Sequence, residues 1–231
     1  MLTRRLSPTA LNLFRECSRC FWLDKVKGIR RPRGIFPSLP SGMDRIIKEY
    51  FDSHRRAGVL PPEVKVGEIG SVSLFPDQRL IDNWRDWRSG LEYKDVSGAV
   101  LFGAIDDLLV QGDVCFPLDY KTKGSPTTQE DSEKYYQNQL DCYALMFKAN
   151  GMKLGKVGVL LYLSPKKVSA NQNVLFDVQT IQVQIDPNRA IEVLRAADTV
   201  LRGTIPEVTS TCEYCSWYTQ RSSFAKSEGV P

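Results

Sequence analysis

The chain has 231 residues, a formal charge of +4 and 42% hydrophobic residues, a length that suits one large domain with a real core or two small ones. Its charged fraction of 25% and aromatic fraction of 10% are those of globular proteins and exclude global disorder. No apolar run approaches the roughly 18 to 20 residues of a membrane span. The first residues lack a secretory signal, so we expect a cytoplasmic protein with no membrane partner.

The N-terminal quarter of the chain predicts helices separated by loops. Ser7-Pro8 is a favourable helix start, and the apolar positions after it predict a helix to about residue 26. A second helix is predicted over 41–57, after a Gly/Pro-rich loop. A short strand over 72–75 and a short helix over 80–91 should follow.

The middle of the chain predicts a sheet. Two apolar-rich strands, 99–109 and 114–121, are separated by Gln111-Gly112-Asp113, which is typical of a hairpin. The rest of the chain predicts, in order, a helix over 132–149, strands over 157–163 and 175–185, and a helix from 187 to about 202. This order favours an α/β fold in which helices flank a central mixed β-sheet.

Charge is distributed unevenly along the chain. Residues 1–58 carry 13 Lys or Arg and 5 Asp or Glu, a net of +8, and the remaining residues have a net of −4. The basic region includes Arg30, Arg31 and Arg33 in a Gly/Pro-rich stretch. Such a region suits a polyanion such as DNA or RNA, or is simply a solvated basic face, and charge alone does not choose between them.

Four of the six cysteines form two Cys-x-x-Cys pairs, one near each end of the chain. In a reducing cytoplasm such pairs more often bind metal or carry redox chemistry than form disulfides. Four thiolates suit a Zn²⁺ ion, a single iron or a [4Fe–4S] cluster, and a redox-sensing protein is a weaker alternative. A metal would clip the N-terminal helix to the C-terminal tail. The paired cysteines are Cys17, Cys20, Cys212 and Cys215, while Cys115 and Cys142 lie in apolar stretches and are predicted to be core residues.

The predicted hairpin carries the candidate catalytic residues. Asp119 and Lys121 are two apart on one strand and therefore share a face. Asp106 precedes the turn on the partner strand and can face Asp119. Two carboxylates with open positions suit Mg²⁺ or Mn²⁺, and a neighbouring lysine can hold a water or stabilise charge in a phosphoryl transition state. The competing interpretation is a salt bridge between Lys121 and an aspartate.

Gln139 and Tyr143 lie four residues apart in the next predicted helix and share one of its faces. Taken alone, this pair is better explained by packing of the tyrosine ring.

Together these residues resemble the PD-(D/E)XK nuclease superfamily, because Gly103-x-x-Asp106 is followed by Asp119-Tyr120-Lys121 and then by Gln139-x-x-x-Tyr143. The resemblance is strongest to the branch that contains the RecB nuclease domain and the CRISPR-associated iron–sulfur exonucleases. It implies a restriction-endonuclease-like core over 96–185 within one nuclease domain over 1–231. The basic helical segment 1–58 and the cysteine tail 203–231 would flank that core.

The resemblance also implies a role for each residue. Asp106, Asp119 and the backbone carbonyl of Tyr120 would bind Mg²⁺ or Mn²⁺. Lys121 would orient or activate the attacking water in phosphodiester hydrolysis, while Gln139 and Tyr143 would support the site or contact the DNA backbone. The four paired cysteines would hold a [4Fe–4S] cluster, with Zn²⁺ as the alternative.

The sequence departs from the family pattern at three places. The early Pro-Asp of the pattern is Ile105-Asp106 here, a substitution that this branch commonly shows. Many relatives carry a metal-binding His on the first core helix, and here that stretch has none. Asp44 and Glu49 are candidate replacements for this ligand, although Ser41-x-x-Asp44 also resembles a capping box. The lone His54 is predicted to be a surface residue. The CRISPR-associated relatives place one cluster cysteine before the core and three after it, whereas this chain has two and two.

Two functions are therefore predicted as alternatives. The first is a metal-dependent DNase, an exonuclease on single-stranded or end DNA, acting in repair, recombination or CRISPR-type defence with protein partners from such a complex. The second is a non-catalytic nucleic-acid-binding or assembly protein that keeps the nuclease fold and a structural four-cysteine site.

Overall fold

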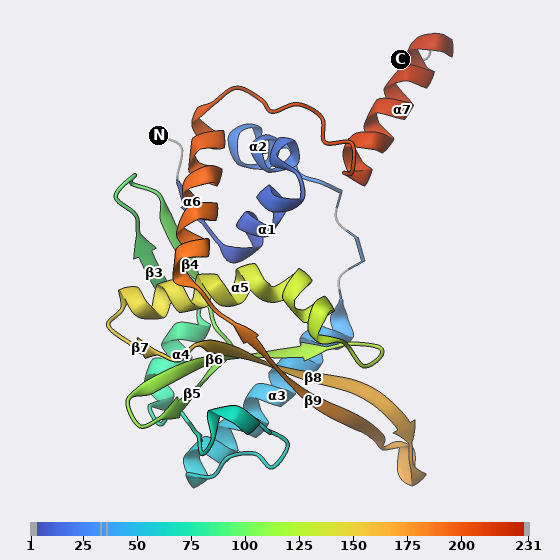
Figure 1. Cartoon of the computed structure of the whole chain (residues 1–231). Coiled ribbons are helices and arrows are strands. Elements are labelled where there is room, and N and C mark those ends of the chain that lie inside the picture. Colours follow the sequence, from blue (N-terminus) through green and yellow to red (C-terminus); the bar gives the residue numbers. More distant parts are fainter. Residues whose placement is uncertain (1–3, 33, 36, 229–231) are drawn as a thin grey trace.

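The computed structural model describes residues 4–32, 34–35 and 37–228, and a six-stranded mixed sheet forms its centre (Figure 1). Five strands follow the order β2-β5-β6-β8-β9, and β7 pairs with β6. The central strand β6 runs antiparallel to β5 and parallel to β8, as the prediction of a mixed sheet requires. The strands are β2 (Ser73–Leu74), β5 (Asp107–Gln111), β6 (Val114–Thr122), β7 (Lys153–Leu154), β8 (Val157–Val168) and β9 (Val174–Gln184).

Helices cover both faces of this sheet, which confirms the predicted α/β class. Helices α5 (Gln129–Ala149), α1 (Pro8–Glu16) and α6 (Pro187–Arg202) lie on one side and α3 (Ser38–Ala57) on the other (Figure 1). Successive residues of β8 alternate between the two resulting cores: Leu160 and Tyr162 belong to the α5 side, and Val159 and Leu161 to the α3 side. Burial on both faces explains why this strand is a continuous apolar run.

The predicted strand over 99–109 is two strands in different sheets. Strand β4 (Val100–Gly103) pairs with β1 (Arg5–Leu6) and β3 (Leu91–Lys94) in a small second sheet, whereas β5 belongs to the main one. Residues 104–106 connect them, so Asp106 lies just before β5 and not within a strand. The apolar pattern continues through this connection because Ile105 is itself buried.

The predicted helix from Ser7 to about residue 26 is also divided. Helix α1 ends at Glu16 and α2 (Ser18–Lys27) begins after Cys17, whose backbone is extended. The Cys17 sulfur accepts a hydrogen bond from the Cys20 amide, 3.4 Å away, and caps α2. The spacing of apolar residues could not predict this break, because a single extended residue interrupts the helix without changing the apolar pattern.

Three more boundaries differ from the predictions. Helix α3 begins at Ser38, so Ser41 is not its cap and the capping-box interpretation of Asp44 is wrong. Helix α4 (Gln78–Arg85) ends early, leaving Trp87 60% exposed while Trp84 is buried. The C-terminal tail contains a helix, α7 (Glu213–Glu228), which projects from the rest of the molecule (Figure 1). Two short 3₁₀ helices, Gly67–Ile69 and Ala170–Gln172, complete the elements.

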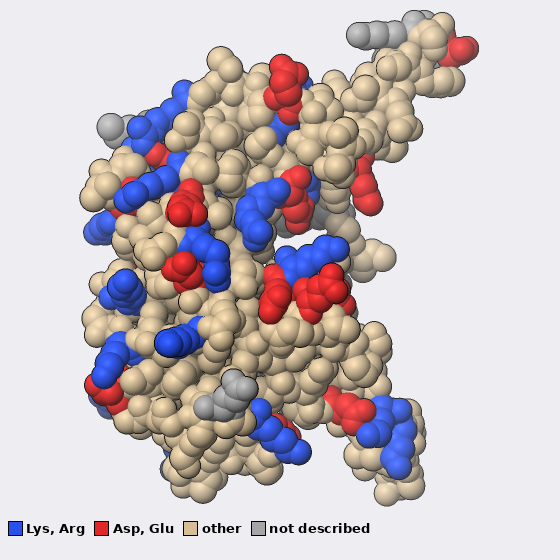
Figure 2. All heavy atoms as spheres, in the orientation of Figure 1, with Lys and Arg blue, Asp and Glu red and all other residues tan. Residues whose placement is uncertain are grey.

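About half of the excess basic charge of residues 1–58 is paired with carboxylates from the rest of the chain, through Arg4, Arg5, Lys48 and Arg55. Eight basic side chains of this segment form ion pairs with carboxylates, and Figure 2 shows both signs of charge interspersed over one face rather than gathered by sign. The paired residues are Arg4, Arg5, Lys25, Arg30, Arg31, Arg45, Lys48 and Arg55.

Among the described residues, no helix combines the length and apolar character needed to cross a membrane.

Candidate active site

Asp119 lies at the centre of the candidate site, on the central strand β6. Its side chain is 1% exposed, and the Lys121 ammonium lies 2.5 Å from its Oδ2 atom. That contact is a buried ion pair, which satisfies the Oδ2 atom. The two residues therefore share one face of β6, as their spacing predicts.

Gln139 and Tyr143 of α5 meet the same carboxylate. The Gln139 amide donates to Asp119 Oδ1 at 2.8 Å and to the Tyr143 hydroxyl at 2.6 Å, and its carbonyl oxygen accepts from Lys121 Nζ at 3.2 Å. The Tyr143 hydroxyl lies 3.3 Å from Asp119 Oδ1. One amide thus fixes the positions of the other three side chains, so the pair is more than packing of a tyrosine ring.

Asp106 reaches the same region from the connection between the two sheets. Its Oδ2 accepts a hydrogen bond from the Tyr120 amide at 3.1 Å, and its Oδ1 lies 2.8 Å from the ammonium of Lys48 on α3. Lys48 also contacts Asp44, one helical turn earlier, at 2.9 Å. Asp44 is therefore linked to Asp106 through Lys48, and no sequence-based prediction included that lysine.

Burial changes the ionisation of the central pair. It raises the pKa of Asp119 to about 7, and the charge of Asp106 adds to the rise, against the lowering effects of Lys121 and Tyr143. For Lys121, burial works to lower the pKa, but the carboxylates of Asp119 and Asp106 outweigh it and hold the pKa above its usual value. Lys121 is thus a cation and hydrogen-bond donor at neutral pH, rather than a proton acceptor.

A second buried cluster supports the hairpin from the α3 side. Asp107 is fully buried and accepts hydrogen bonds from Arg55 (2.6 and 2.7 Å), the Tyr120 hydroxyl (2.6 Å) and Arg85 (3.2 Å). Arg85 also donates to the backbone carbonyl of Asp106 at 2.8 Å. Tyr120 thereby points away from Asp119, and the backbone of Asp106 is held in place.

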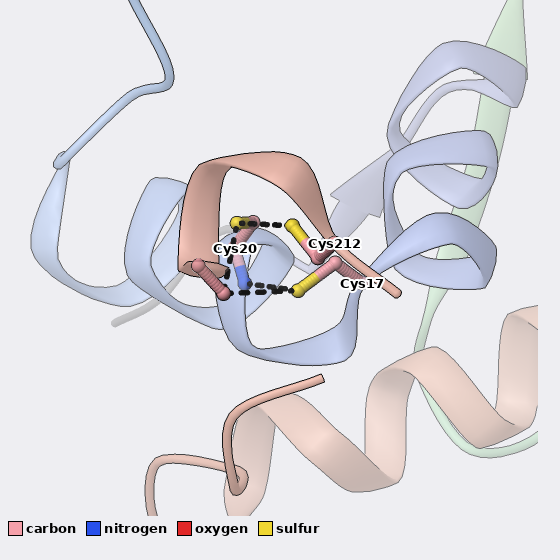
Figure 3. A group of neighbouring side chains, drawn as sticks. Cys17, Cys20 and Cys212 are labelled. Atoms are coloured by element: carbon pink, nitrogen blue, oxygen red, sulfur yellow. Dashed lines mark hydrogen bonds between the residues drawn. The ribbon is translucent and has the colours of Figure 1, made fainter. Parts of the chain in front are cut away.

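The four paired cysteines converge where α2 and α7 begin, and Figure 3 shows Cys17, Cys20 and Cys212 pointing toward one another. The four sulfurs all lie within 4.8 Å of one another, and all four side chains are buried. This cluster connects the start of α2 with the start of α7, in agreement with the prediction that the four cysteines link the two ends of the chain. Among the described residues, no other group of three or more His, Cys, Asp or Glu side chains is arranged to hold a metal ion. Cys115 and Cys142 are buried in the main core, as predicted.

A family model described as the PD-(D/E)XK nuclease superfamily matches residues 5–220. The chain belongs to the PD-(D/E)XK nuclease superfamily. A comparison with curated proteins found no match. Among solved structures, the chain is similar to an alkaline exonuclease (LHK-Exo) from Laribacter hongkongensis, with 8% identity, a TM-score of 0.38, and coverage of 96% of this chain and 95% of that one.

The donor set fits the divalent ion that nucleases of this superfamily typically use. Asp106 and Asp119 supply hard oxygen ligands, which Mg²⁺ and Mn²⁺ prefer. Lys48 and Lys121 meanwhile balance the two carboxylates.

The superfamily's early glycine has a packing role here. A Cβ atom at Gly103 would lie 3.3 Å from both Pro8 of α1 and Met146 of α5. These close contacts bring the start of α1 next to α5, where Gln139 and Tyr143 border a cavity of about 250 Å³ that is also lined by Ser7, Pro8 and Asn12. His54, half-buried near the end of α3, packs against the Tyr50 ring at a tilt of 59° and takes no part in this site.

Proposed function

We propose that this protein is a metal-dependent nuclease that hydrolyses phosphodiester bonds of DNA, as an exonuclease on single-stranded or end DNA. The observation that carries the proposal is the buried Asp119, which is kept beside Lys121 and Asp106 at the end of β6. A buried carboxylate with a pKa near 7 is costly for stability, and such groups concentrate where chemistry needs them.

Each residue has a role that follows from its contacts. Asp106, Asp119 and the Tyr120 carbonyl would hold Mg²⁺ or Mn²⁺, which polarises the phosphate and lowers the pKa of bound water. Lys121, charged at neutral pH, would orient the attacking water and stabilise the negative charge that develops on the phosphate. Gln139 holds Lys121 and Asp119 in position through one hydrogen bond to each. Tyr143 accepts a further hydrogen bond from the Gln139 amide and fixes its orientation.

The cavity beside Gln139 and Tyr143 is where the DNA backbone would run. It is bordered by the first turn of α1, whose Pro8 and Thr9 line it together with Ser7. Pro8 has no amide hydrogen and the Ala10 amide donates to the Ser7 hydroxyl, so α1 would attract phosphate mainly through its dipole. The strand would thus lie between α1 and α5 with its scissile phosphate at Asp119.

The alternative is a non-catalytic nucleic-acid-binding or assembly protein. The connected set of Asp106, Asp119, Lys121 and Gln139 favours the enzyme, because binding alone has no need for a buried carboxylate balanced by a lysine. We also infer that the four cysteines hold a metal, with the [4Fe–4S] cluster of the resembled branch and Zn²⁺ as the two candidates. Membership of that branch, and a setting in repair, recombination or CRISPR-type defence with protein partners, belong to the same proposal.

The mode of cleavage is tested with matched DNA substrates. Purified protein with Mn²⁺ or Mg²⁺ should degrade linear single-stranded DNA to short products and leave a closed single-stranded circle of the same sequence intact. Cleavage of the circle at a similar rate would show an endonuclease and contradict the exonuclease proposal. Linear duplexes with blunt and frayed ends then establish whether the free end has to be unpaired.

Asp44 and Asp106 should differ in their importance. Asp106→Asn should lower the cleavage rate by about 10²-fold or more, because it removes a proposed metal ligand. Asp44→Asn should lower it by less than about tenfold, since Asp44 contacts Lys48 and reaches Asp106 only through it. Initial rates at saturating Mg²⁺ measure both. Equal losses in the two variants would instead make Asp44 a direct ligand, in place of the histidine that the first core helix lacks.

Cleavage should depend on pH through Asp119. The pKa of this carboxyl is raised to about 7, so each pH unit below 7 leaves about a tenth as much carboxylate to bind the metal. At limiting Mg²⁺ we expect the rate to fall about tenfold per unit between pH 6.5 and 5. Saturating Mg²⁺ should move the fall to lower pH, because the ion competes with the proton. A rate that stays level down to pH 5 at limiting Mg²⁺ would contradict this ionisation.

A further inference from the structure

The four-cysteine cluster has the dimensions of a single-ion site. Three of its sulfur pairs are separated by 3.7 Å (Cys17 and Cys215), 3.8 Å (Cys20 and Cys212) and 3.9 Å (Cys20 and Cys215). A tetrahedral ion with metal–sulfur bonds of about 2.3 Å places its four sulfurs about 3.8 Å apart. These separations are also far longer than a disulfide bond, and all four thiols are free.

A [4Fe–4S] cluster needs a wider arrangement. Its four thiolates each bind a different iron at the corners of a metal–sulfide cube, so the sulfurs are farther apart than around one ion. Here all four sulfurs lie within 4.8 Å of one another and leave no room for such a cube. The residues present therefore do not fit the cluster that the resembled branch implies.

Both pairs of cysteines are placed in the same way. Cys17 caps α2 and Cys20 follows in its first turn, while Cys212 directly precedes α7 and Cys215 lies in that helix's first turn. The Cys20 amide donates to the Cys17 sulfur at 3.4 Å. A helix N-terminus stabilises negative charge, so both helices favour thiolates at this point.

Arg31 supplies a positive charge beside these thiols. Its Nη2 lies 3.5 Å from the Cys212 sulfur, its Nη1 contacts Glu16 at 2.6 Å, and its guanidinium stacks on the Tyr214 ring at 4.6 Å. Four thiolates around a divalent ion have a net charge of −2. A fixed arginine that donates to one of them offsets some of this charge and orients the ligand.

We propose that the four cysteines bind one tetrahedral Zn²⁺ ion, in place of a [4Fe–4S] cluster, and that Arg31 is a positioning residue for this ion. Zinc is the ion that four thiolates in a closed tetrahedral site select for a structural role. The inference does not depend on nuclease activity, because metal content and affinity are measured on the protein itself.

The metal is identified by composition. The full chain is expressed in medium that supplies both iron and zinc and is purified without oxygen, so that a cluster would survive. We expect about one zinc per chain, no acid-labile sulfide and a colourless protein. Exchange with Co²⁺ should then produce the intense visible absorption of a tetrahedral cobalt thiolate site. A brown protein containing iron, with or without sulfide, would overturn the proposal.

The role of Arg31 is tested with a neighbouring arginine as the control. Arg31→Ala should weaken Zn²⁺ binding by about tenfold or more in competition with a chromophoric chelator. Arg30→Ala removes an exposed arginine that pairs with Asp24 and should leave the affinity unchanged within about twofold. Both variants keep all four cysteines and should have the circular dichroism spectrum of the parent. Equal affinities in the two variants would show that Arg31 does not act on the ion.

Discussion

Lys121→Ala should lower the rate of DNA hydrolysis by about 10²–10³-fold, as expected for the loss of a group that stabilises charge in the transition state. The same change leaves Asp119 buried without its nearest cation, and a carboxyl in that situation takes up a proton more readily. The variant should therefore also need more Mg²⁺ for half-maximal activity. Initial rates across a Mg²⁺ titration measure both effects.

Lys123 offers a matched control for this prediction. It follows Lys121 by two residues, and its ammonium contacts the Thr127 hydroxyl at 2.9 Å. Lys123→Ala removes the same charge close by and should lower the rate by less than about tenfold. If both variants lose activity equally, or if Lys121→Ala cleaves at the parental rate with its fold intact, the assignment of Lys121 is wrong.

Cys20→Ala should strongly destabilise the protein, because the cysteine clip joins α2 to α7 across most of the chain. Binding of a structural metal contributes directly to the free energy of unfolding, by about 10 kcal/mol or more in small domains. Losing even about 3 kcal/mol of this would lower the Tm by roughly 6–12 °C for a chain of this size. Thermal unfolding followed by circular dichroism measures the change.

Cys115→Ala is the control for loss of a buried thiol. Cys115 lies in the main core, 4% exposed and away from the cluster, so its replacement should cost about 1 kcal/mol or roughly 2–4 °C in Tm. Removing the metal from the parent with a strong chelator should reproduce the larger shift, and returning the metal should reverse it. Equal Tm values for the two variants would contradict a stabilising metal clip.

The hairpin and the helix after it could be predicted because their signals are local. Residues two apart in a strand share a face, and residues four apart in a helix share another. The spacing alone therefore predicted that Asp119 and Lys121 share one face and that Gln139 and Tyr143 share another. That these two pairs contact each other could be seen only in the folded structure. The cysteine cluster could be anticipated from the spacing within each pair, although nothing local shows that the two ends of the chain converge.

Other features depend on long-range packing. Lys48 lies on a helix that shows no signal for a site, and it reaches Asp106 only because α3 packs against the face of β6 that carries Tyr120. Asp107, Arg55 and Arg85 are far apart in sequence and form one buried network by the same packing. The sequence did not predict that the chain leaves one sheet after Gly103 and enters the other, because the apolar pattern continues through the connection.

The basic first quarter of the chain shows why net charge in a sequence is a poor predictor of a binding surface. Its net charge of +8 suits a polyanion-binding face or a solvated one, and four of its thirteen cations are paired with carboxylates from the rest of the chain. Net charge along a sequence counts residues, whereas the surface potential depends on which charges remain unpaired after folding. The candidate DNA path lies at the start of α1 and along α5, and a neighbouring cavity that shares Ser7, Thr9 and Asn12 with it reaches Arg31.

The central claim is that Asp106 and Asp119 hold a divalent ion with which this protein hydrolyses DNA. The most direct test is the rate of DNA hydrolysis by the purified parent as Mg²⁺ or Mn²⁺ is added to chelator-treated protein. We expect no cleavage without the ion, a saturable rise in rate as it is added, and no rise at all in Asp119→Asn. Cleavage that persists in excess chelator, or a protein that cleaves no DNA substrate at any metal concentration, would contradict the claim.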